Sequence, residues 1–98
     1  MEPVTLDDLK TFAKELDGQT LVTRFQHCRF SLSVSEEGCK YTPELRGKER
    51  HQPWRWIGRI LDRFNETRSL HPSDYKSVHA SYVLTIIGEY LESLPAIA

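Results

Sequence analysis

The stretch RFSLSVSEEGCKY, residues 29–41, decides the fold, because its apolar side chains recur at every second position. A phenylalanine, a leucine and a valine alternate with an arginine and serines, which is the pattern of a strand with one buried face. A glutamate-glycine pair then supplies turn chemistry, and Cys39 and Tyr41 resume the alternation on the same face. The stretch therefore predicts an antiparallel hairpin with strands over 29–35 and 39–42.

The chain before this hairpin predicts a helix and a further strand. Thr5 and Asp8 have the spacing of a variant capping box, and Gly18 stands where a helix commonly closes. Between them, four apolar residues recur at helical spacing: Leu9, Phe12, Ala13 and Leu16. After the glycine, the helical spacing gives way to a pattern that alternates at every second position. We therefore expect a helix over 6–17 and a strand over 20–26.

The chain after the hairpin predicts two helices and two polar connections. Residues 43–52 contain a proline, a glycine and no periodicity, which predicts an exposed connection. Pro53 suits the first position of the next helix, because its missing N–H would be unpaired there anyway. We expect helices over 53–65 and 78–94, joined by the polar segment 65–74. The last helix is apolar over nearly half of its circumference, which is typical of a central, buried helix.

These elements predict one α+β domain over residues 1–98, with the order α-β-β-β-α-α. The three strands would form a small antiparallel meander, and a sheet of this size needs helices packed against its apolar face. A winged-helix arrangement fits less well, because in that family the helices generally precede a terminal hairpin.

Length and composition predict a small soluble protein of the cytoplasm. The chain has 98 residues and a net charge of −1. It holds no run of the roughly 20 apolar residues that span a bilayer, and its N-terminus lacks the pattern of a signal peptide. We therefore expect no membrane partner. Cys28 and Cys39 are expected to be free thiols, because a reducing compartment disfavours disulfides.

Positive charge is concentrated in one part of the chain. Residues 46–63 hold six of the 13 basic side chains and both tryptophans, against two acidic side chains. On a helix over 53–65 the apolar residues form one arc, three arginines lie together on the opposite side, and Trp56 lies beside the last of them. The candidate partner-binding residues are Arg46, Lys48, Arg50, Arg55, Trp56, Arg59 and Arg63.

Three interpretations of this surface stay open. It can be a solvated helix face, since long arginine side chains keep exposed helices soluble. It can bind nucleic acid, because the helical arginines rise by about 6 Å per step, close to the spacing of phosphates, and Trp56 could stack on an unpaired base. It can instead dock an acidic protein surface, or the acidic first helix of a second copy in a homodimer, because Trp and Arg dominate interface energies.

The sequence predicts a non-catalytic binding module without a metal or other cofactor. It has no glycine-rich phosphate loop, no nucleophile elbow and no H-E-x-x-H motif. The histidines and cysteines between residues 27 and 51 lack the paired ligand spacing of small zinc sites. His51 and His71 are the candidate bases of a remote alternative, a metal-free ribonuclease. A nucleic acid and an acidic protein are the rival partners.

Overall fold

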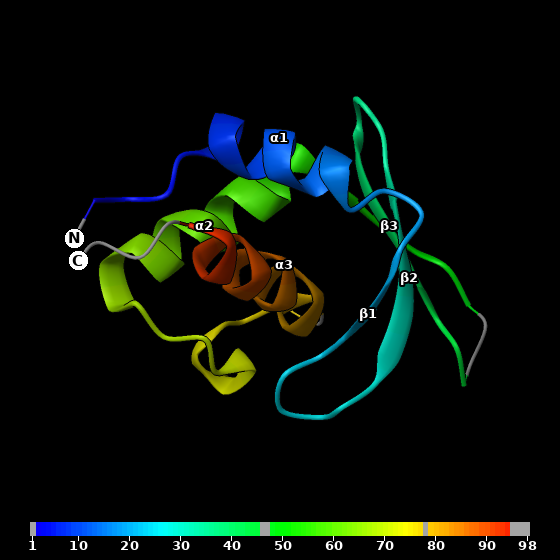
Figure 1. The fold of residues 1–98 in the computed structure, drawn as a ribbon. Coiled ribbons are helices and arrows are strands. Elements are labelled where there is room, and N and C mark those ends of the chain that lie inside the picture. The colour runs from blue at the N-terminus through cyan, green and yellow to red at the C-terminus, as the bar shows by residue number, and fades with distance from the viewer. Residues whose placement is uncertain (1, 46–47, 78, 95–98) are drawn as a thin grey trace.

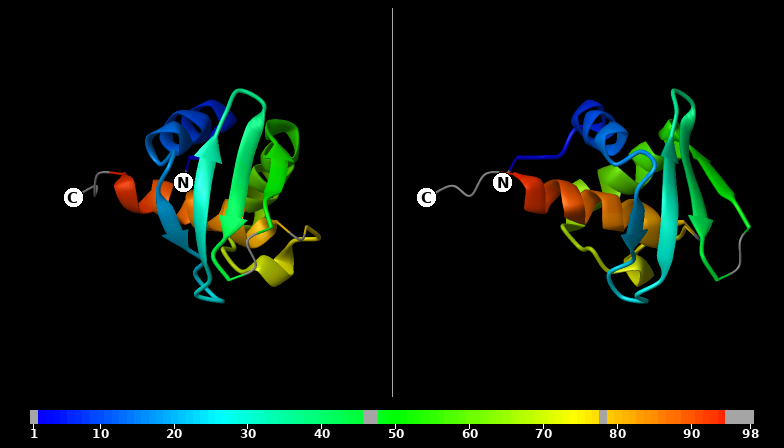
Figure 2. Two further views of the ribbon diagram at one scale, coloured as in Figure 1. Left: turned by 90° about the vertical axis from the view of Figure 1, so that its right-hand side faces the viewer. Right: turned by 45° about the vertical axis from the view of Figure 1, so that its right-hand side comes forward.

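Four antiparallel strands and three α-helices make up the described part of the computed structural model, residues 2–45, 48–77 and 79–94. The helices are α1 (Leu6–Glu15), α2 (Trp54–Thr67) and α3 (Ala80–Ser93), with a 3-10 turn η1 (Pro72–Asp74). The strands are β1 (Thr20–Val22), β2 (Arg29–Val34), β3 (Gly38–Pro43) and β4 (Arg50–Pro53). The helices lie on one face of the sheet (Figure 1), and the other face is turned away from them (Figure 2, left).

β2 and β3 form the hairpin that the alternation predicts. They pair antiparallel, with Leu32 opposite Tyr41 and Val34 opposite Cys39. Phe30 and Leu32 are fully buried, as are Cys39 and Tyr41 on the partner strand. The α+β class, the antiparallel register of this hairpin and its buried face are therefore confirmed.

Within the described residues the sheet has a fourth strand, so the predictions of three strands and of an exposed connection over 43–52 are wrong. β4 pairs antiparallel with β3, placing Gln52 opposite Cys39. The strand is four residues long, and its one fully buried side chain is polar. Gln52 accepts a hydrogen bond from the Tyr41 hydroxyl at 2.9 Å. A search for alternating apolar residues misses such a strand, because its buried face is held by a side-chain hydrogen bond.

The first strand is shorter than the predicted range of 20–26. β1 ends at Val22, because the following residues turn back toward β2. The Thr23 hydroxyl accepts a hydrogen bond from the Cys28 backbone N–H at 2.9 Å. His27 adopts a left-handed φ of 54°, which extended strands do not contain.

The predicted helices are present, with differences at their ends. α1 ends at Glu15 rather than at residue 17. α2 runs to Thr67 rather than to residue 65, and it closes where Arg68 takes a left-handed φ of 57°. The predicted start of the last helix, residue 78, lies outside the described residues, and α3 begins at Ala80.

β4 runs directly into α2. Pro53, which the sequence placed in the helix, is the last residue of β4, and Trp54 begins α2. The Trp54 backbone N–H donates to the Glu37 carbonyl at 3.2 Å, and its indole N–H donates to the Ser35 carbonyl at 3.0 Å. These two hydrogen bonds therefore hold the point where β4 meets α2 against the turn between β2 and β3.

The helices bury the apolar faces that their sequences predict. α2 buries one arc: Trp54, Ile57, Ile60, Leu61 and Phe64. α3 buries every residue from Val83 to Gly88, as expected of the central helix. Despite this apolar character, no helix in the described ranges is both long and apolar enough to span a bilayer.

The two cysteines are expected to differ in reactivity. Cys39 is a buried free thiol in β3, and burial raises its pKa to about 12, whereas Cys28 is exposed. Since the thiolate is the reactive form, iodoacetamide should modify only Cys28 in the native protein and both cysteines after unfolding. Mass spectrometry of the digested protein measures this. Rapid modification of Cys39 under native conditions would show that β3 opens readily and would contradict the expectation.

Candidate functional site

α2 carries one buried and one exposed indole. Trp54 is 6% exposed and belongs to the core, whereas Trp56 is 42% exposed. A spacing of about 100° per residue separates the two indoles in this way, because Trp56 falls outside the apolar arc. The helical phase predicted from the sequence therefore agrees with the position of Trp56.

Two arginines lie against the exposed indole. The Arg59 guanidinium carbon is 4.4 Å from the centroid of the Trp56 ring, and that of Arg55 is 5.5 Å away. Each contact is within the range of a cation–π attraction, worth roughly 0.5–1 kcal/mol at an exposed site. The indole and the guanidinium groups of this helix face therefore form one continuous surface.

This surface borders a cavity of about 760 Å³. Its lining includes Trp56, Arg59 and Arg63 from α2, and Tyr75, Lys76 and His79 from the segment that leads into α3. The volume is within the range of small-molecule sites, roughly 300–1,000 Å³. We call this cavity the Trp56 cavity.

The structure brings together only part of the predicted set. Arg55 contacts Trp56 but does not line the cavity. Lys48 is exposed outside it, and Arg46 lies outside the described residues. Arg50 was expected on an exposed loop before α2, but it is the first residue of β4 and is half-buried. The expectation that Arg50 lies in an exposed connection is therefore wrong, because its backbone pairs with Tyr41 of β3.

Sequence patterns missed the second wall of the cavity. Tyr75 and Lys76 belong to a polar segment without periodicity, and His79 precedes α3. Residues in such a segment are placed by tertiary contacts that no local pattern contains. No local signal in the sequence therefore marks Lys76 or His79 as a lining residue.

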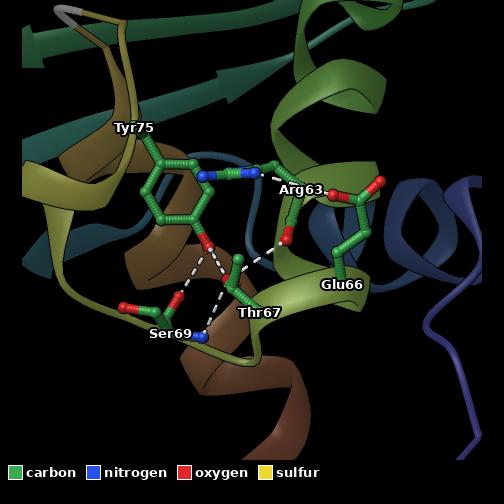
Figure 3. Close-up of polar contacts among 5 residues, drawn as sticks. All are labelled: Arg63, Glu66, Thr67, Ser69 and Tyr75. Carbon is green, nitrogen blue, oxygen red and sulfur yellow. Dashed lines mark hydrogen bonds and ion pairs between the residues drawn. The ribbon is translucent and has the colours of Figure 1, made fainter.

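Hydrogen bonds hold this second wall against the C-terminal end of α2 (Figure 3). The Tyr75 hydroxyl donates to the Ser69 carbonyl at 2.6 Å and lies 3.5 Å from the Thr67 hydroxyl. Thr67 in turn donates to the Arg63 carbonyl at 3.1 Å. Burial raises the pKa of Tyr75, so its hydroxyl remains a donor at neutral pH. The segment that carries Lys76 is thereby tied to the helix that carries Arg63.

The Trp56 cavity is positively charged. Among its described lining residues, three are Arg or Lys and one, Asp74, is acidic. Asp74 accepts a hydrogen bond from the Ser69 hydroxyl. Arg63 is 3.6 Å from Glu66, in a pair that is exposed on both sides and therefore contributes little. The cavity is thus suited to an anionic group.

His79 adds a neutral polar group to the lining. Burial lowers its pKa, and the positive charge of Arg50 lowers it further, so the ring is uncharged at neutral pH. Its Nδ1 is buried and has no hydrogen-bond partner among the described residues. Buried polar atoms are paired in most structures, so an unpaired one beside a cavity is informative.

Comparisons with models of known protein families, with curated proteins and with solved structures find no match to this chain. What the site can bind therefore follows from its own residues.

The other histidines and cysteines of the described residues do not form a cluster that could hold a metal ion. Over residues 2–45, 48–77 and 79–94, no group of three or more His, Cys, Asp or Glu side chains could hold a metal ion. His51 lines the cavity, but His71 does not. The Nδ1 of His71 accepts a hydrogen bond from the Ser73 N–H at 3.2 Å, and the centroid of its ring lies 4.5 Å from that of the Phe25 ring, with the two rings tilted. The two candidate bases of the ribonuclease alternative therefore do not share the cavity.

Proposed function

We propose that the protein is a non-catalytic binding module that holds nucleic acid on the Trp56 face of α2. The observation that supports this most is the exposed Trp56 ring, with Arg59 and Arg55 within 5.5 Å of its centroid. An indole offers a stacking surface for an unpaired base, and guanidinium groups neutralise phosphates. Both elements of nucleic-acid recognition are therefore present on one helix face.

An acidic protein partner is the second candidate. Exposed Trp and Arg are also the residues that dominate protein interfaces, so the same contacts support it. The acidic first turn of α1, with Asp7 and Asp8, makes a second copy one such partner. Salt separates the candidates, because phosphate binding releases counterions and weakens steeply as salt rises, whereas a Trp-centred protein interface responds less.

Tryptophan fluorescence tests the proposal. We expect a single-stranded oligonucleotide to quench the emission of the native protein in a salt-dependent manner, because Trp56 is exposed. The Trp56→Phe variant should show no quenching, since its remaining indole, Trp54, is buried under the 35–38 turn. The measurement is a titration at low and at moderate salt, with iodide as an independent probe of exposure.

Two outcomes would contradict the proposal. If iodide quenches Trp56 but the oligonucleotide does not, the surface is a solvated face or a protein-docking site. If sedimentation instead shows a dimer that dissociates as salt rises, a second copy occupies the surface.

A further inference from the structure

The Trp56 cavity restricts the form of nucleic acid that the site can take. It is a concave site of about 760 Å³ whose walls come from three parts of the chain: β4, α2 and the segment before α3. A duplex presents its phosphates on a convex surface and keeps its bases stacked inside, so it cannot bring a base to Trp56. A single strand exposes its bases for stacking on aromatic side chains.

The charges of the cavity match a phosphate beside the stacked base. Arg59 and Arg63 are on the same wall as Trp56, and Lys76 faces the cavity from the other segment. Because the hydrogen bonds of Tyr75 tie that segment to the end of α2, Lys76 and Arg63 stay at one site (Figure 3). Cations from two elements surround a phosphate more completely than a stripe on one helix does.

The unpaired Nδ1 of His79 is a second observation at the same cavity. His79 lines the cavity, yet this atom has no hydrogen bond among the described residues. Because this atom is buried, a ligand reaches it only when the His79 ring turns, and the donors and acceptors along the edge of a base can then pair with it. A phosphate-binding surface alone gives no reason for a neutral, incompletely bonded imidazole in a cavity that three cationic side chains also line.

We infer that the Trp56 cavity holds one unpaired nucleotide of a single strand, with its base on Trp56 and its phosphate between Arg63 and Lys76. This inference rests on the proposed function and adds the class of nucleic acid, together with Lys76 as a contact residue. In this arrangement Arg55, which lies outside the cavity, contacts phosphates that are not bound in it.

Three fluorescently labelled probes of equal charge test the inference: a single strand of about ten nucleotides, an abasic strand with the same phosphates, and a duplex hairpin. We expect the native protein to bind the single strand between about fivefold and about 150-fold more tightly than the abasic strand, because a stacked base contributes that much. The duplex should bind as weakly as the abasic strand. Fluorescence anisotropy at one fixed salt concentration measures all three.

Lys76→Ala and Lys14→Ala form a matched pair of variants. Both lysines are exposed, but Lys14 is in the last turn of α1 and outside the cavity. Lys76→Ala should weaken binding of the single strand and reduce its salt slope by about 0.7, the value for one phosphate contact. Lys14→Ala should change neither.

The outcomes separate the inference from the proposed function. Equal binding of all three probes, with salt dependence, would leave the nucleic-acid surface in place and overturn the nucleotide cavity. Binding of none would overturn both. A free mononucleotide that competes as well as the strand would overturn the assignment to a strand.

Discussion

Replacement of Gly38 by alanine is expected to lower the free energy of unfolding by about 3 kcal/mol. A Cβ at this position would lie 2.0 Å from the Gln52 carbonyl oxygen and 2.7 Å from the Pro53 Cα. Both contacts are with backbone atoms of β4, which cannot rotate away as the end of a side chain can. The methyl group would therefore force β4 away from β3 at the point where the strand joins α2.

Gly18→Ala is the matched control for this change. Gly18 has a left-handed φ of 83°, but no atom lies within 4 Å of a Cβ built there. Its replacement should cost about 1–2 kcal/mol, which is the penalty of the left-handed conformation alone. Urea denaturation followed by circular dichroism measures both variants. A loss at Gly38 no larger than that at Gly18 would show that β4 can shift without a cost in packing.

Reversal of two charges, Arg59→Glu with Arg63→Glu, is expected to weaken binding of a single strand by about a hundredfold at low salt. Each arginine lines the cavity, and a charge-assisted hydrogen bond to a phosphate is worth at least about 1.5 kcal/mol. Loss of two phosphate contacts should also reduce the slope of log affinity against log salt by about 1.4. Anisotropy titrations over a series of salt concentrations give both quantities.

Net charge alone could produce part of this loss, so the control must change it equally. Lys14→Glu with Arg29→Glu does so, since both side chains are exposed on other elements, α1 and β2. We expect this variant to retain most of the native affinity. Equal losses in the two double variants would place the effect in the overall field of the protein rather than in the cavity.

The sequence predicted those parts of the fold that apolar periodicity specifies. Phe30 and Leu32 lie on the buried face of β2, and Ile57 and Phe64 lie in the buried arc of α2, at the positions their spacing indicates. The same phase placed Trp56 on the surface. These results share one cause, because a repeating apolar contact with the core fixes both the type of the element and its orientation.

The sequence failed where a polar contact or a distant segment determines the structure. β4 was missed because Gln52, its buried residue, is held by the hydroxyl of Tyr41. Lys76 and His79 were missed because their segment reaches the cavity through the hydrogen bonds of Tyr75, which have no local pattern. The candidate site was therefore predicted on one wall only, the helical one.

The direct passage from β4 into α2 has a consequence for the energetics of recognition. Pro53 has a restricted φ, and Trp54 is anchored by two hydrogen bonds to the turn between β2 and β3. These contacts hold the start of the helix against the sheet, so the backbone that carries Trp56 is positioned before a partner arrives. A ligand that stacks on Trp56 therefore loses little backbone entropy in ordering this part of the site, so the helix is preorganised where the aromatic contact is made.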